Sequence, residues 1–166
     1  MKRTSYCDMP CPMAQALERV GEWWSLLILR EAFRGVRRFG EFERRLGIAK
    51  NVLSARLKHL VAAGVLERRP SADDAREVEY RLTASGKDLA PVLVALAQWG
   101  ERWVYEGRAP VRFVDRQTGK RLAPLGLRDE DGSPIALRDL AIRPCPDAAG
   151  DPDAALSGPA DPGKVP

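Results

Sequence analysis

The chain has 166 residues, of which 45% are hydrophobic and 30% are charged, and a net charge of +4. This composition is typical of a globular protein; no apolar run approaches the roughly 20 residues of a membrane span, and no secretory signal precedes the first helix, so we expect a cytoplasmic protein. Three cysteines and one histidine, with no phosphate-binding loop, nucleophile elbow or acid–base cluster, argue against an enzyme and against a metal or other cofactor.

Helical patterns occupy the first half of the chain. Residues 1–10 have the character of a short, poorly ordered arm, and Pro12 stands near the start of a helix that Gly21 ends. A second helix, from about Ser25 to Phe33, is apolar on almost every side. That pattern indicates burial at the centre of a small bundle.

Two short amphipathic helices follow, joined by a tight turn at Gly47. Each has apolar residues at spacings of three and four, at Phe39, Phe42 and Leu46 and then at Leu53, Leu57 and Leu60. The opposite side of the second helix is small, polar or basic, with Asn51, Ser54, Ala55 and Lys58, and with Arg56 at its edge. Such a helix suits a DNA major groove, although an ordinary surface helix pair explains this stretch alone equally well.

Basic residues concentrate in the same part of the chain. Between Arg34 and Arg69 there are ten lysines and arginines against three glutamates. Clustering of this kind is what the neutralisation of DNA phosphates requires.

The period then changes from helix to strand. Residues 65–69 and 78–82 alternate apolar and polar side chains as half-buried strands do, and a polar loop joins them. Three helices followed by a hairpin make a winged helix.

A last helix, from about Gly86 to Glu106, carries two apolar rows, and we expect one row to bury against a second copy of the chain. The alternative is that both rows pack on the domain itself. Candidate dimerisation residues are Met13, Leu17, Leu89, Val92, Leu96, Trp99 and Trp103.

The remaining residues divide into an appendage and a tail. After the main domain, residues 11–107, the pattern predicts short strands and turns at Thr118-Gly119 and Asp131-Gly132, a small β appendage over residues 108–145. Residues 146–166 consist mostly of Pro, Ala, Gly and Asp, so we expect disorder there.

With these residues laid out, the chain resembles the HxlR family of bacterial winged-helix transcriptional regulators, within the MarR-like superfamily. The motifs that carry the resemblance are Cys11-Pro12, Gly21-Glu22-Trp23-Trp24, Arg38-Phe39, Leu46-Gly47-Ile48-Ala49, Leu53 with Arg56-Leu57 and Leu60, Gly64-Val65-Leu66, Glu79-Tyr80-Arg81-Leu82-Thr83 and Trp99-Gly100. The resemblance implies a mainly α fold with small β, in which dimerisation helices flank a winged helix-turn-helix. It also implies a homodimer that reads a pseudo-palindromic site in double-stranded DNA, with half-sites about one turn apart.

Two features depart from the family pattern. The wing loop is more acidic than expected, which leaves Arg76 as its main candidate for DNA contact. The appendage resembles a zinc-ribbon tail that keeps the turn glycines Gly119 and Gly132 but lacks the thiolates, so we expect a ribbon-like β unit without metal.

The expected DNA contacts are of two kinds. The phosphate candidates are Arg37, Arg38, Arg68, Arg69 and Arg76. The base-edge candidates are Lys50, Asn51, Ser54, Arg56 and Lys58, because Asn suits adenine and Arg or Lys suits guanine. An intramolecular ion pair is the alternative for Arg56, and we expect His59 to be solvated.

The signal that controls binding has two candidate sites. Some members of the family sense oxidants or electrophiles through a cysteine at the place of Cys11, and Cys7 is a candidate resolving thiol. The alternative is that Cys11 is a buried small hydrophobe. Trp23, Trp24, Trp99 and Trp103 are candidates to hold an aromatic effector, or are simply core. We expect a dimeric repressor; a protein-binding winged helix that docks through the appendage is the alternative.

Overall fold

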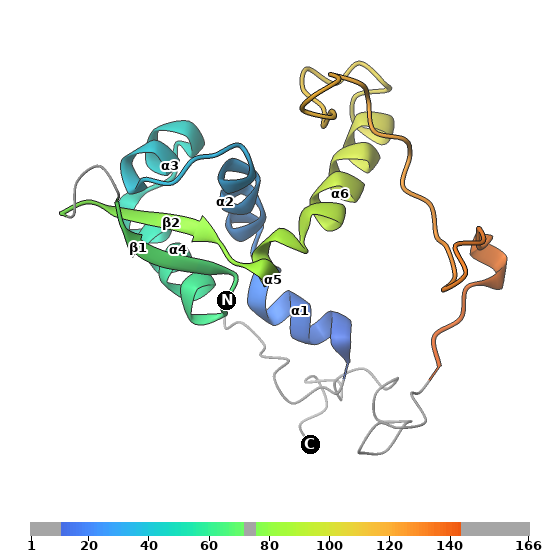
Figure 1. Ribbon diagram of the computed structural model, residues 1–166, viewed down its shortest axis with the longest axis horizontal. Coiled ribbons are helices and arrows are strands. Elements are labelled where there is room, and N and C mark those ends of the chain that lie inside the picture. The colour runs from blue at the N-terminus through green and yellow to red at the C-terminus, as the bar shows by residue number, and fades with distance from the viewer. Residues whose placement is uncertain (1–10, 72–75, 144–166) are drawn as a thin grey trace, which may run out of the picture.

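The computed structural model describes residues 11–71 and 76–143 (Figure 1). The expectations for residues 1–10, Cys7 and the tail 146–166 therefore lie outside the described residues. The elements are α1 (Pro12–Val20), α2 (Trp23–Phe33), α3 (Phe39–Leu46), α4 (Lys50–Ala62), β1 (Leu66–Pro70), β2 (Val78–Leu82), α5 (Ala84–Lys87), α6 (Ala90–Trp103) and the 3-10 turn η1 (Leu137–Asp139). No helix in these ranges has the length and apolar character to cross a membrane.

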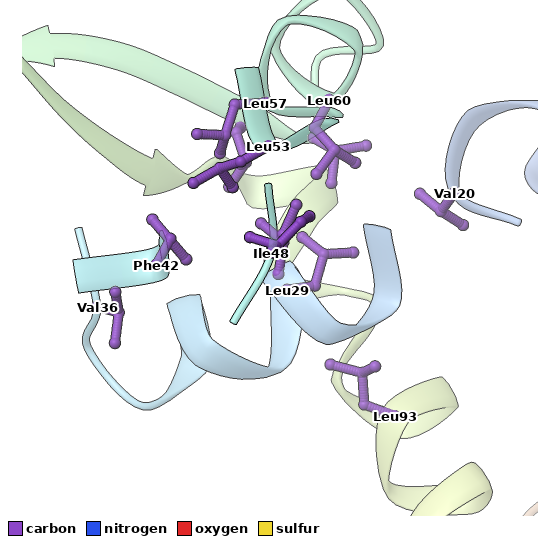
Figure 2. Packing of buried hydrophobic residues seen from close by; sticks show 12 residues of the cluster. Val20, Leu29, Val36, Phe42, Ile48, Leu53, Leu57, Leu60 and Leu93 are labelled. Carbon is purple, nitrogen blue, oxygen red and sulfur yellow. The ribbon is translucent and has the colours of Figure 1, made fainter. Parts of the chain in front are cut away.

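The core is built around α2, as the apolar character of its sequence predicts. Ile28 and Leu29 of this helix are fully buried, and α2 contacts α1, α3, α4, β2 and α6. Phe42 of α3 and the leucine row of α4 close on it from one side (Figure 2). The helix-turn-helix is therefore held by apolar contacts that leave the opposite side of α4 free for other contacts.

The turn between α3 and α4 depends on a glycine. Gly47 ends α3 with φ of 61°, in the left-handed region that a residue with a Cβ adopts only at a cost. Ile48, the next residue, is buried beneath the turn. This arrangement sets the angle at which α4 leaves α3.

The wing is the antiparallel pair β1–β2, with Arg68 opposite Tyr80. Tyr80 and Leu82 pack against the core as their alternation predicts, but Glu79, which the same alternation turns outward, is also buried. The reason is that the α2–α3 loop covers the outer edge of β2: Arg38 forms an isolated bridge with Glu79, and the Tyr80 amide donates to the Arg37 carbonyl over 2.8 Å.

The helix expected over residues 86–106 is in fact two helices. Thr83 caps α5, because its side-chain oxygen accepts from the Gly86 amide at 3.1 Å. Pro91 lies in the first turn of α6. Proline lacks the amide that would continue the hydrogen bonds of a preceding helix, so α5 ends and α6 begins at a new angle.

The β appendage is the largest departure from the sequence prediction. Within residues 108–143, which we call the C-terminal arm, only two isolated bridges form, Val114 with Arg121 and Arg128 with Pro134. The predicted turns are present, with Gly119 at φ of 68° and Gly132 at 81°. The expected strands, and with them the sheet of a ribbon, do not form, because most side chains of the arm are exposed and provide no apolar layer for a sheet.

Candidate nucleic-acid interface

The exposed side of α4 carries the residues that the sequence assigned to bases. Leu53, Leu57 and Leu60 are fully buried beneath the helix. The residues left exposed on the far side are Lys50, Asn51, Ser54, Ala55 and Lys58. Because these spacings of three and four place side chains on one face, the structure brings four of the five base candidates together.

Arg56 does not belong to that group. Its Nη1 lies 3.7 Å from Oε1 of Glu22, and its side chain is only 25% exposed. Its Nε is buried without a hydrogen-bond partner in the described part of the chain. The guanidinium thus faces the turn between α1 and α2, and the intramolecular ion pair is the alternative that the structure shows.

His59 makes a second contact with the same region. Its Nε2 lies 3.0 Å from the backbone carbonyl of Arg19, so that nitrogen donates to the carbonyl oxygen. We expect a solvated histidine from the sequence; in the structure the ring stays partly exposed, and this contact joins α4 to the end of α1.

The phosphate candidates lie on the α2–α3 loop and the hairpin, which the bridge between Arg38 and Glu79 holds together. Arg38 is paired with Glu77 at 2.8 Å, and Arg69 with Glu67 at 2.8 Å. The side chains of Arg37, Arg68 and Arg76 are exposed. The described part of the wing therefore carries acids beside two of its arginines.

Two buried glutamates were not recognised in the sequence. Glu79 accepts from Arg81 at 2.9 Å and from the Ser71 hydroxyl at 3.3 Å, and Arg37 lies 3.9 Å away. The hydrogen bond from Arg81 holds the pKa of Glu79 below its ordinary value; the charges of Arg81 and Arg37 and the Ser71 hydroxyl add to this effect, while burial opposes it. Glu79 thus fixes arginines at the base of the wing.

Glu31 is the second of these acids. It is buried in α2 with Arg30 at 2.9 Å, Arg34 at 3.2 Å and Arg45 of α3 at 3.7 Å. An acid inside an otherwise apolar helix was a visible signal, because a buried carboxylate requires cationic partners. Arg30 and Arg34 are near neighbours of Glu31 in the sequence, but Arg45 was not apparent as a partner, since it comes from another helix.

Exposed apolar residues mark a second surface, on α6. Val92, Leu96, Trp99 and Trp103 follow one another at spacings of four, three and four, and we call this row the apolar stripe. Leu96 is 50% exposed, Trp99 61% and Trp103 63%. Met13 and Leu17 of α1 are exposed as well, whereas Leu89, expected in the same interface, packs against the core of its own domain.

The C-terminal arm folds back onto α6 beside this surface. The Gln98 amide donates to the Ala123 carbonyl at 2.9 Å and accepts from the Leu125 amide at 2.8 Å. Glu101 pairs with Arg112 at 3.2 Å and Arg121 at 3.3 Å. We call these contacts of Gln98 and Glu101 the arm clamp.

A cavity of about 1120 Å³ lies between the arm and α6, and Trp99, Trp103 and Phe113 line it. Trp23 and Trp24 do not; their rings pack on each other with centroids 5.4 Å apart. The four tryptophans proposed for an effector are thus divided between two places.

Comparison with known proteins agrees with this architecture. The regulator Rv3095 of Mycobacterium tuberculosis, named as an HTH-type transcriptional regulator, is 42% identical over 135 residues, which are 81% of this chain and 85% of that protein. The crystal structure of PA1607, assigned as a transcription factor, is 44% identical and superposes with a TM-score of 0.78 over 84% of this chain and 98% of that one. The oxidised form of HypR, described as a redox regulator, is 29% identical with a TM-score of 0.51, over 61% and 100% of the two chains.

The family model described as HxlR-like helix-turn-helix matches residues 19–108, from the end of α1 through α6. These residues hold the exposed face of α4, the wing and the apolar stripe. The proteins with which the chain aligns are named as transcriptional regulators or transcription factors, a class of protein that is not enzymatic. The chain therefore belongs to the HxlR-like helix-turn-helix family of transcriptional regulators.

Proposed function

We propose that the protein is a homodimeric transcriptional repressor that reads a pseudo-palindromic operator with α4, in the cytoplasm and on the nucleoid. The observation that carries this proposal is the division of α4 into a buried leucine row and an exposed face of Asn51, Ser54 and Lys58. A helix of this kind presents hydrogen-bonding and cationic groups to base edges in a major groove. The arginines of the α2–α3 loop and wing supply phosphate contacts, which position the protein without reading sequence.

The apolar stripe supports a homodimer. Monomeric proteins rarely expose a large continuous apolar surface, and two tryptophans of one helix are more than half exposed here. A two-fold dimer through α6, with α1 beside it, places two copies of α4 on half-sites about one DNA turn apart. Such a dimer on a promoter blocks access of polymerase, which is why we propose repression.

DNA binding is tested with the full chain. Genomic fragments retained by the protein are sequenced, and the affinity for the enriched site is followed by fluorescence anisotropy as salt rises. We expect a steep loss of affinity between about 50 and 200 mM salt. Lys58→Ala should weaken binding by about 1–3 kcal/mol, because this side chain lies on the exposed face of α4.

The matched control is Lys87→Ala, which removes the same charge from α5, outside the proposed interface. Equal effects of the two changes contradict the assignment of the α4 face. No binding even at low salt rejects the regulator proposal and leaves the protein-binding alternative.

We include redox control in the proposal. Cys11 is the residue that precedes α1 and carries a free, half-buried thiol, and the similar HypR is described as a redox regulator. We expect diamide, which accepts two electrons and two protons as the thiols of Cys11 and Cys7 join in a disulfide, to reduce DNA affinity at least about tenfold, and dithiothreitol to restore it. Cys11→Ser should not respond. A wild-type protein and a Cys11→Ser variant that respond alike exclude Cys11 as the sensor.

A further inference from the structure

The distal part of the arm, residues 126–143, leaves its own domain. The arm clamp holds the arm to α6 as far as Leu125. Beyond it, the hydrogen bonds among the described residues join the arm to itself, such as Ile135 to Leu127 at 2.9 Å and Leu140 to Leu137 at 3.3 Å. In Figure 1 this segment runs down beside α6, on the side away from α2, α3 and α4.

This distal segment nevertheless carries large apolar side chains. Leu127, Leu137, Leu140 and Ile142 are all exposed, Leu137 to 79% and Ile142 to 81%. Leu137 and Leu140 are three residues apart at the turn η1, where residues three apart lie on the same side. A segment that displays apolar groups in this way gains by packing them against another surface, because ordering the segment costs conformational entropy.

We propose that this distal segment packs on a second copy of the same chain, against the exposed apolar residues of the second copy's α1 and α6. The inference rests on the homodimer proposed above and adds a second, reciprocal contact to it. One chain carries both an uncovered apolar segment and an uncovered apolar stripe. In a two-fold dimer each copy gives its segment to the other and receives one in return, so the arm contact and the contact through α6 together cover both surfaces.

The areas agree with this arrangement. The apolar stripe exposes on the order of 400 Å² of side chain, to which its two tryptophans contribute most. The four apolar side chains of the distal segment expose a similar area. Their sum approaches the roughly 800 Å² per partner of a stable interface, which the stripe alone does not reach.

The segment begins at a fixed point on its own domain. The arm clamp starts the segment from one place on α6, because Gln98 and Glu101 each bind the arm at two points. The match to Rv3095 covers 135 residues and cannot fit within the first 108, so that regulator shares part of the arm.

The first experiment locates the segment. Benzoylphenylalanine is placed at Leu137 in the full chain, the protein is exchanged with an excess of ¹⁵N-labelled wild type, and mixed dimers are confirmed by native mass spectrometry before irradiation. We expect light-to-heavy crosslinks to peptides of α1 or α6. Crosslinks confined to one chain, or none in a sample that is dimeric, overturn the proposal.

The second experiment measures the contribution of the segment to assembly by analytical ultracentrifugation. The double variant Leu137→Glu, Ile142→Glu should raise the dimer dissociation constant at least tenfold, and both positions are exposed, so the fold of the domain is not at risk. Gln117→Glu adds a charge to an exposed position of the arm ahead of Leu125 and should leave the constant unchanged.

If the dimer dissociation constant of the double variant lies within twofold of the wild-type value, the proposal is overturned, whether or not the segment binds another protein. The outcome for the proposed function is separate. If the wild type is a dimer that binds its operator and the double variant does both equally well, only the arm inference fails. If the wild type is a monomer that does not bind DNA, the homodimeric regulator itself is rejected.

Discussion

Asn51 and Arg56 lie five positions apart on α4, and the fold gives them different surroundings. Asn51 is exposed in the first turn, on the same face as Ser54 and Lys58. Arg56 is half-buried and reaches Glu22 at the start of α2. One residue is therefore available to DNA, while the other belongs to the packing of the domain.

Replacing each of them should separate recognition from stability. Asn51→Ala is expected to cost about 1–3 kcal/mol of discrimination at one base position and to leave the free energy of unfolding unchanged. Arg56→Ala should lower the free energy of unfolding by about 1 kcal/mol, through loss of the ion pair and of the packing of its stem, without changing any base preference. Competition with operators substituted at single bases and urea unfolding measure the two effects. An altered base preference in Arg56→Ala would mean that Arg56 contacts DNA bases, which contradicts its assignment to the packing of the domain.

Periodicity in the sequence was sufficient to place Asn51, Ser54 and Lys58 on one face, because spacing along a helix is a local property. It was not sufficient for Arg56, whose partner lies 34 positions earlier in the chain. The same is true of Glu79. Its burial depends on the α2–α3 loop, which comes to the edge of β2 only in the folded domain.

At the scale of the element, the wing contains a group that responds to pH. The pKa of Glu79 is held below its ordinary value, first by the hydrogen bond from Arg81. A carboxylate of this kind contributes stability above its unfolded pKa, and that contribution is lost as pH falls through the lower, folded pKa. The wing is therefore expected to weaken in acid.

Urea unfolding as a function of pH tests this expectation. Below a pH of about 4, the free energy of unfolding of the wild type should fall more steeply than that of Glu79→Gln, in which no proton is taken up at this position. Glu67→Gln, the same replacement on β1, is the matched control. Parallel curves for the wild type and Glu79→Gln would show that Glu79 does not stabilise the wing through its charge.

In the C-terminal arm the sequence predicted the turns correctly but not the strands. The turns at Gly119 and Gly132 were predicted correctly, because a turn depends on a few adjacent residues. A strand also needs a partner and an apolar layer, and neither is present for Val114 or Arg128 beyond a single bridge. The prediction of one continuous helix over residues 86–106 was wrong for a local reason, since Pro91 in the sequence already indicates the start of a new helix.

At the scale of the whole molecule, the apolar stripe is expected to decide assembly. Leu96→Glu places a carboxylate in the middle of the proposed interface, where it has no water, and should raise the dimer dissociation constant at least about 100-fold. Operator affinity should fall with it, because one α4 reads only a half-site. Ultracentrifugation and anisotropy measure the two quantities. Ser85→Glu, which adds a charge to exposed α5, is the control, and a Leu96→Glu variant that stays dimeric contradicts the assignment of the stripe.

Two contacts join α4 to the N-terminal helices. Arg56 reaches Glu22, and His59 reaches the carbonyl of Arg19, so α4 is tied at two points to the corner between α1 and α2. Under the proposed function, we expect a displacement of α1 to shift α4 as well, because these two contacts join α4 to the end of α1 and the start of α2. A change near Cys11, which precedes α1, would then alter the fit of α4 to DNA.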